Sequence, residues 1–109
     1  MIKNANVVNV FTKEIMRADV AMHEETIIGI GSFRAQREYD AEGAYLCPGF
    51  IDSHVHIESS MVIPPTFARA VIVHGTTAVI ADPHEIANVC GVSGIRAMYK
   101  FTDHIPLKV

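Results

Sequence analysis

The spacing of hydrophobic positions changes near residue 47. Before it, short apolar or β-branched stretches alternate with polar turns, and these stretches cover residues 2–10, 18–22, 26–30 and 39–46. Runs of this kind, bounded by turn residues, predict strands. Their close spacing favours antiparallel pairing in a small sheet. Residues 1–47 therefore read as one β-rich segment, distinct from residues 48–109.

After residue 47 the pattern predicts strands in alternation with helices. The expected elements are a strand at 50–57, a helix at 64–74, a strand at 76–81, a helical segment from 82 broken at Gly91, a second helical stretch at 94–101 capped by Ser93, and a strand at 105–109. The strand at 76–81 is apolar at most positions, which is typical of a strand buried on both faces of a parallel sheet. Right-handed crossovers would place the three late strands in one such sheet.

This order indicates an α/β fold with a β-rich N-terminal segment, in which the later elements open a (β/α)₈ barrel. A complete barrel takes about 250 residues. A chain of 109 residues can hold only its first units. We therefore interpret the chain as a fragment of a larger fold.

Composition narrows the class of protein. Apolar residues make up 50% of the chain and charged residues 19%, as in globular proteins, and a net charge of −3 provides no basic surface for nucleic acid. No apolar run approaches the roughly 18 residues of a membrane span. No secretory segment opens the sequence, so we expect a cytoplasmic protein with no membrane partner. Cys47 and Cys90 lack metal-binding spacing and are interpreted as reduced, buried thiols.

Two histidines two positions apart carry the strongest chemical signal. Side chains at i and i+2 of a strand point to the same face, so His54 and His56 should converge. Two neutral imidazoles side by side make half of a metal site. In a barrel, the active site lies at the C-terminal ends of the strands. The polar residues at those ends are His54, His56 and Glu58 after the first strand, and Asp82, His84 and Glu85 after the second.

Residues 82–85 allow a second interpretation. Asp82 at the N-cap, Pro83 at the first helical position and Glu85 two positions later would form a capping arrangement worth about 1 kcal/mol. Capping explains Asp82 and Glu85 without any catalysis, but it does not explain His84. A cap and a ligand are compatible, so both interpretations stay open.

A rival zinc motif can be set aside. His56-Ile57-Glu58 matches the His-x-Glu of the zinc nucleobase deaminases that resemble cytidine deaminase. Those enzymes complete the zinc shell with Pro-Cys-x-x-Cys. Here Cys47 precedes its proline and Cys90 stands alone, so the match fails.

The run Pro48-Gly49-Phe50-Ile51-Asp52-x-His54-x-His56 resembles the amidohydrolase superfamily. Within it, the stretches at residues 54–61, 74–77 and 81–89 are similar to the adenine deaminases. The resemblance implies a metal-dependent hydrolase on a distorted (β/α)₈ barrel with a small β-sandwich. Residues 1–47 would be the N-terminal part of that sandwich, and residues 48–109 the opening β-α-β-α-β units of the barrel.

The same resemblance implies an activity and a cofactor. The activity is hydrolytic deamination of adenine to hypoxanthine and ammonia in purine salvage, by a metal-activated hydroxide. His54, His56 and His84 are the candidate metal ligands, with manganese or iron in a binuclear centre of the complete enzyme. Glu85 and Glu58 are the candidate catalytic carboxylates. The chain lacks the ligands of later strands, so we expect it to be inactive alone and to cover its unpaired strand edge by forming a homo-oligomer.

Two alternatives remain. The first is another amidohydrolase acting on a cyclic amide, resembling dihydroorotase or imidazolonepropionase. The second is a non-enzymatic metal-binding or assembly module, which would be a stable oligomer that binds metal without deaminating anything.

Overall fold

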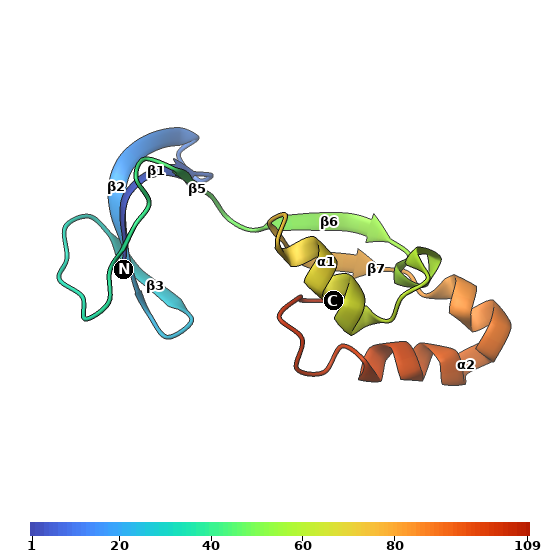
Figure 1. Cartoon of the computed structure of the whole chain (residues 1–109). Coiled ribbons are helices and arrows are strands. Elements are labelled where there is room, and N and C mark those ends of the chain that lie inside the picture. Colours follow the sequence, from blue (N-terminus) through green and yellow to red (C-terminus); the bar gives the residue numbers. More distant parts are fainter. The chain divides into compact units, whose positions relative to one another are not determined.

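The computed structural model describes all 109 residues, which form two compact units, Met1–Pro48 and Gly49–Val109 (Figure 1). None of the helices is long and apolar enough to cross a membrane.

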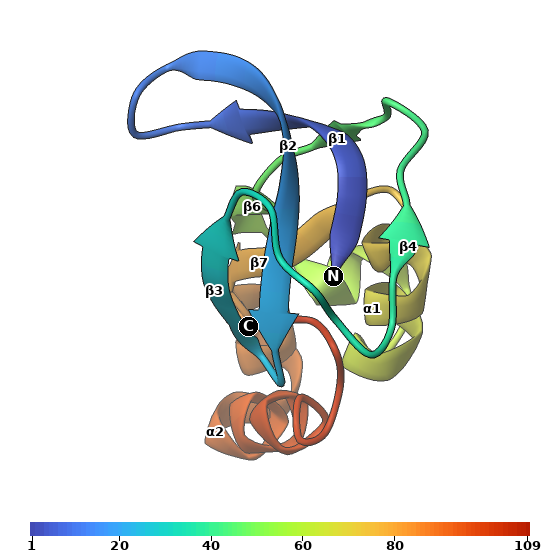
Figure 2. The same ribbon diagram turned by 90° about the vertical axis from the view of Figure 1, so that its left-hand side faces the viewer.

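Three strands dominate the N-terminal unit. They are β1 (Ile2–Asn9), β2 (Glu14–His23) and β3 (Thr26–Ile30). β2 pairs with both neighbours in antiparallel fashion, and Figure 2 shows it curving between them. These strands and their antiparallel pairing confirm the sequence prediction. Ala5, Val7 and Val20 form the buried core of the unit.

The prediction of one continuous strand at 39–46 is wrong. The segment contains two separate strands of two residues, β4 (Tyr39–Asp40) and β5 (Tyr45–Leu46), and each pairs with β1 in parallel. A turn separates them because Glu42 and Gly43 adopt positive φ angles of 52° and 83°. The Asp40 side chain accepts a hydrogen bond from the Glu42 backbone N–H at 2.8 Å, which fixes this turn.

The C-terminal unit is built on a parallel strand pair. Its elements are β6 (Phe50–Val55), the 3₁₀ helix η1 (Ile57–Ser60), α1 (Pro64–Ile72), β7 (Thr76–Ala81) and α2 (His84–Lys100). β6 and β7 run parallel and are connected through η1 and α1, which confirms the predicted β-α-β order. The buried core consists of Ile57, Phe67, Ala68, Val79 and Leu107.

The two strands approach each other closely where β6 begins. A Cβ atom on Gly49 would overlap the side chain of Thr77 in β7. The Phe50 N–H donates to the Gly75 carbonyl at 2.8 Å at the same end of the pair. Only glycine fits at position 49, so the Pro-Gly-Phe motif has a packing reason in addition to its turn chemistry.

The third late strand, expected at 105–109, is reduced to one bridge. Lys108 pairs with Ala78 in parallel, its N–H donating to the Thr77 carbonyl at 3.0 Å and its carbonyl accepting from Val79 at 2.8 Å. Pro106 has no N–H to extend the pairing. The segment therefore runs beside β7 without forming a regular strand.

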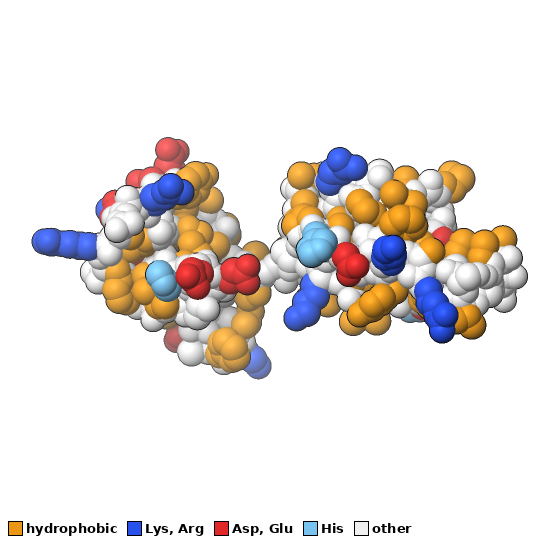
Figure 3. Space-filling model, turned by 90° about the horizontal axis from the view of Figure 1, so that it is seen from below, with side chains coloured by type: hydrophobic (Ala, Val, Ile, Leu, Met, Phe, Trp, Pro, Cys, Tyr) orange, Lys and Arg blue, Asp and Glu red, His pale blue; other side chains and the backbone are white.

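Burial also differs from the prediction. In β7 only Val79 is buried, whereas the neighbouring Ile80 is 62% exposed. The sheet has two strands and packs its core on one face, so the opposite face stays open. Figure 3 shows hydrophobic side chains on the face of this unit that it draws. Cys47 and Cys90 are free but exposed, so the expectation of buried thiols was wrong.

The last helix bends where the sequence predicts a break. α2 runs from His84 to Lys100, but Gly91 leaves helical geometry at φ 59°, ψ −153°, so two helical segments meet at a kink there. The Ser93 hydroxyl donates to the Cys90 carbonyl at 2.6 Å. It therefore bridges the bend as a donor, rather than accepting from a helix N–H as an N-cap would.

Candidate metal centre

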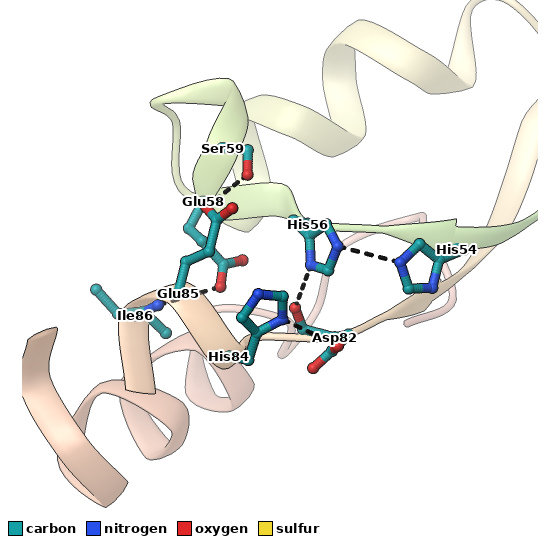
Figure 4. A network of polar contacts seen from close by, with 8 residues as sticks. All are labelled: His54, His56, Glu58, Ser59, Asp82, His84, Glu85 and Ile86. Carbon is teal, nitrogen blue, oxygen red and sulfur yellow. Dashed lines mark hydrogen bonds and ion pairs between the residues drawn. The ribbon is translucent and has the colours of Figure 1, made fainter. Parts of the chain in front are cut away.

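Two imidazoles meet at the C-terminal end of β6. His54 lies in the strand, His56 follows its last residue, and their Nε2 atoms are 3.1 Å apart (Figure 4). The rings are nearly perpendicular, with centroids 4.7 Å apart and an interplanar angle of 86°. The extended backbone of His56 (φ −108°, ψ 97°) continues the strand geometry, which keeps both side chains on one side.

Strand pairing fixes the tautomer of His56. The Asp82 N–H donates to the Val55 carbonyl at 3.0 Å, so residues 56 and 82 lie side by side after the parallel strands. The Asp82 carbonyl then lies 2.7 Å from His56 Nδ1. A carbonyl only accepts, so Nδ1 carries the proton and the neutral ring keeps its lone pair on Nε2. Metal-binding histidines are oriented by the same kind of hydrogen bond.

The spacing of the two Nε2 atoms fits a shared cation. Nitrogen ligands at about 2.1 Å from one metal ion are roughly 3.0–3.4 Å apart, for angles between 90° and the tetrahedral value. The observed 3.1 Å lies within that range. Imidazoles next to a carboxylate form a mixed donor set that suits several divalent transition metals.

A second pair of polar side chains adjoins these rings. His84 Nδ1 lies 3.0 Å from Asp82 Oδ2, and the His84 ring is 4.6 Å from that of His56 between centroids. His56, Asp82 and His84 each offer one ligand atom, and these atoms lie within 4.8 Å of one another. The single lone pair of His56 can serve only one ion. The neighbouring side chains that could share that ion are His54, Asp82 and His84.

The capping interpretation of Asp82 and Glu85 was wrong. The N-cap residue of α2 is Pro83, no side chain of that residue caps the helix, and the Asp82 carboxylate is paired with His84. The side chain that caps α2 comes from η1 instead. Glu58 Oε1 accepts a hydrogen bond from the Ile86 N–H at 3.2 Å. Sequence patterns predict caps only from residues next to the helix start, so they could not predict a cap from Glu58 in η1.

Glu85 is held from the same 3₁₀ helix. The Ser59 hydroxyl donates to Glu85 Oε2 at 2.5 Å. Figure 4 shows both glutamates between η1 and the start of α2, near the His84 ring. The six residues expected at the strand ends thus lie in one region, whereas His74 and His104 make no side-chain hydrogen bond or ring contact with this cluster.

Comparison with known proteins places the chain in a family. The model of the amidohydrolase family matches residues 45–109. The chain belongs to the amidohydrolase family. Enzymes of this family use divalent metals, and the matched range contains every candidate ligand of the centre described above.

Individual amidohydrolase family members are also similar. Over all 109 residues the chain is 59% identical to the adenine deaminase of Clostridium acetobutylicum and 57% identical to that of Geobacillus kaustophilus, covering 19% of each. The solved structure of the L-hydantoinase (dihydropyrimidinase) from Arthrobacter aurescens matches 75% of the chain, and 20% of its own length, with a TM-score of 0.62 and 26% identity. The chain therefore spans about a fifth of these relatives.

Proposed function

We propose that this chain is part of a metal-dependent adenine deaminase, which hydrolyses adenine to hypoxanthine and ammonia in purine salvage. The observation that carries the proposal is the 59% identity to an adenine deaminase over the whole chain. The arrangement of His54 and His56, with Nε2 atoms 3.1 Å apart and the tautomer of His56 fixed, supports the metal-dependent part.

The proposal extends to architecture. Residues 48–109 would be the first units of a (β/α)₈ barrel, and residues 1–47 part of a β-sandwich. The parallel β6–β7 pair with its α1 crossover supports the barrel, as does the position of the polar cluster at the C-terminal ends of both strands. The exposed apolar face of β7, with Ile80 62% exposed, supports association with further structure, including a homo-oligomer.

His54 and His56 would hold one metal ion, with His84 as a further candidate ligand. We propose that the ion is manganese or iron and that the complete enzyme has a binuclear centre. When bound, such an ion would lower the pKa of a water molecule, so that hydroxide is available as a nucleophile near neutral pH. His54, His56 and His84 together would supply the three protein ligands usual for one catalytic metal, but not those of a second ion. We therefore expect the 109-residue chain to be inactive by itself.

Deamination needs a group that moves a proton. Water adds at C6 of the purine and the amino group leaves as ammonia, so one proton must pass from the water to the amino nitrogen. Glu85 is the better of the two carboxylates for this role. Each carboxylate has one oxygen in a hydrogen bond, but Glu58 Oε1 accepts from the backbone N–H of Ile86 at the start of α2, whereas Glu85 Oε2 contacts only the side-chain hydroxyl of Ser59. A carboxylate offers about four lone-pair positions, so Glu85 can still accept a proton.

A chimera tests the proposal. This chain replaces the matching residues of the Clostridium acetobutylicum adenine deaminase, and ammonia release from adenine is measured after loading with Mn²⁺ or Fe²⁺. We expect turnover, and we expect His56→Ala to lower it by at least about a hundredfold. His23→Ala, in the N-terminal unit, should leave it unchanged. A folded, metal-loaded chimera that releases no ammonia would refute the proposal.

A second candidate is hydrolysis of a cyclic amide, favoured by the likeness to the hydantoinase structure. The parent-length protein, assayed in parallel with adenine, hydantoin and dihydrouracil, separates the two activities. Turnover of the cyclic amides without turnover of adenine would replace the first proposal with the second.

A further inference from the structure

Helix α2 begins without a capping side chain from its own sequence. The first amides of a helix need acceptors from outside it. Here Glu58 of η1 supplies one, its Oε1 accepting from the Ile86 N–H at 3.2 Å (Figure 4). A carboxylate at this end is also favoured by the helix dipole. The start of α2 is thus fixed by a residue 28 positions earlier in the chain.

The next residue of η1 makes a second contact. The Ser59 hydroxyl donates to Glu85 Oε2 at 2.5 Å, so consecutive residues of η1 bind consecutive residues of α2. We call Glu58, Ser59, Glu85 and Ile86 the η1–α2 clamp. Ile57, which precedes it, is 2% exposed and belongs to the core. The clamp therefore joins a surface carboxylate to a segment anchored in the interior.

We propose that Ser59 is a positioning residue for Glu85, and that Glu58 holds the helix start rather than reacting. The inference rests on the proposed function, in which Glu85 carries the proton. Glu85 is exposed, and a free glutamate side chain samples many rotamers. Proton transfer requires a donor–acceptor distance of about 2.6–3.2 Å. A short hydroxyl–carboxylate hydrogen bond restricts the side chain while occupying one oxygen.

Positioning can be separated from a purely structural role. Ser59→Ala removes the hydroxyl that holds Glu85 but leaves the Glu58–Ile86 contact intact. Ser60→Ala is the matched control, because Ser60 is the next exposed residue of η1 and makes no side-chain contact in the clamp. Ser59→Thr keeps a hydroxyl and should restore what Ser59→Ala loses.

The first experiment uses the chimera with the Clostridium acetobutylicum enzyme. We expect Ser59→Ala to lower kcat about tenfold, as is common for partners that orient a reacting group, with KM and metal content unchanged. Ser59→Thr should recover the rate, and Ser60→Ala should match the parent. In a Glu85→Gln background, Ser59→Ala should have no further effect. An unchanged kcat, or an equal loss in the Glu85→Gln background, would overturn the inference.

The second experiment needs no activity. Carboxyl ¹³C signals of glutamates are recorded for the 109-residue chain at pH 7, with Glu85 assigned from its Gln variant. Ser59→Ala should shift the Glu85 signal, and Ser60→Ala should leave it in place. An unmoved Glu85 signal would overturn the inference. If the chimera fails to deaminate adenine, the proposed function fails, and this measurement still decides whether Ser59 holds Glu85.

Discussion

The two units form their sheets by different routes, and the difference explains where the chemistry gathers. In the N-terminal unit, β1, β2 and β3 are successive antiparallel strands, so the C-terminal end of each lies beside the N-terminal end of the next. In the C-terminal unit, β6 and β7 are parallel, and their C-terminal ends coincide. Residues that follow two parallel strands therefore lie close together, and His56 Nδ1 is 2.7 Å from the Asp82 carbonyl oxygen.

Histidine placement shows the same contrast. His23 ends β2 at the turn of the antiparallel β2–β3 pair and has no side-chain hydrogen bond or ring partner. His54, His56 and His84 are linked in a chain of contacts. The same side chain is thus an isolated surface group in one topology and a candidate ligand in the other. The substitutions below test how far this contrast holds.

The largest expected effect comes from glycines at close approaches in the two units. Gly49→Ala would drive a Cβ atom into the Thr77 side chain close to the backbone of β7, and we expect a loss of about 3 kcal/mol in the free energy of unfolding. Gly29→Ala in β3 meets only the ring tip of Phe33, which is 45% exposed and can move. Its cost should stay below about 1 kcal/mol.

Denaturant unfolding measures the two losses of stability separately when it is followed through amide NMR signals, those of β6 for Gly49→Ala and those of β3 for Gly29→Ala. Equal costs would mean that parallel pairing in the C-terminal unit does not depend on the tight contact at Gly49.

The next effect concerns metal affinity. We expect the 109-residue chain to bind Mn²⁺ weakly, and His54→Ala or His56→Ala to weaken binding at least about tenfold, since even losing a residue that orients a ligand has an effect of that size. His23→Ala should leave the affinity unchanged. Titration calorimetry compares the three variants. Equal weakening by His23→Ala would show that Mn²⁺ binds histidines without regard to topology.

Sequence patterns predicted the features that depend on neighbours along the chain. The hairpins of β1–β3, the crossover through α1 and the bend at Gly91 follow from turn residues and apolar spacing. The convergence of His54 and His56 follows from the two-residue period of a strand.

Features that depend on which partner a polar group finds were not predictable. The Asp82 carboxylate had two possible partners, its own helix and His84, and only the fold decides between them. The cap of α2 comes from Glu58 across 28 positions, which no local rule registers. The apolar spacing of residues 105–109 is that of a strand, but regular pairing also needs N–H groups, which Pro106 lacks.

The smallest expected effect is a pH dependence in the N-terminal unit. The Glu42 backbone N–H, followed by the Asn4 side chain, lowers the pKa of Asp40 below its ordinary value. A carboxyl whose pKa is lowered by folding stabilises the fold above its unfolded pKa of about 3.9 and loses that contribution as the pH falls through the folded value. The turn between β4 and β5 should therefore weaken in acid.

Asp40→Asn tests this dependence. The variant should be slightly less stable than the parent at pH 7, and the difference should shrink steadily below about pH 4 because the parent's carboxylate becomes protonated. Glu25→Gln, an exposed acid of the same unit without a side-chain hydrogen bond, is the control and should show no such convergence. Thermal unfolding between pH 2 and pH 7 measures both (a range of about five units around the ordinary carboxyl pKa). A constant difference between parent and Asp40→Asn across that range would show that the charge of Asp40 does not hold the turn, and that the turn relies on backbone geometry at Glu42 and Gly43 alone.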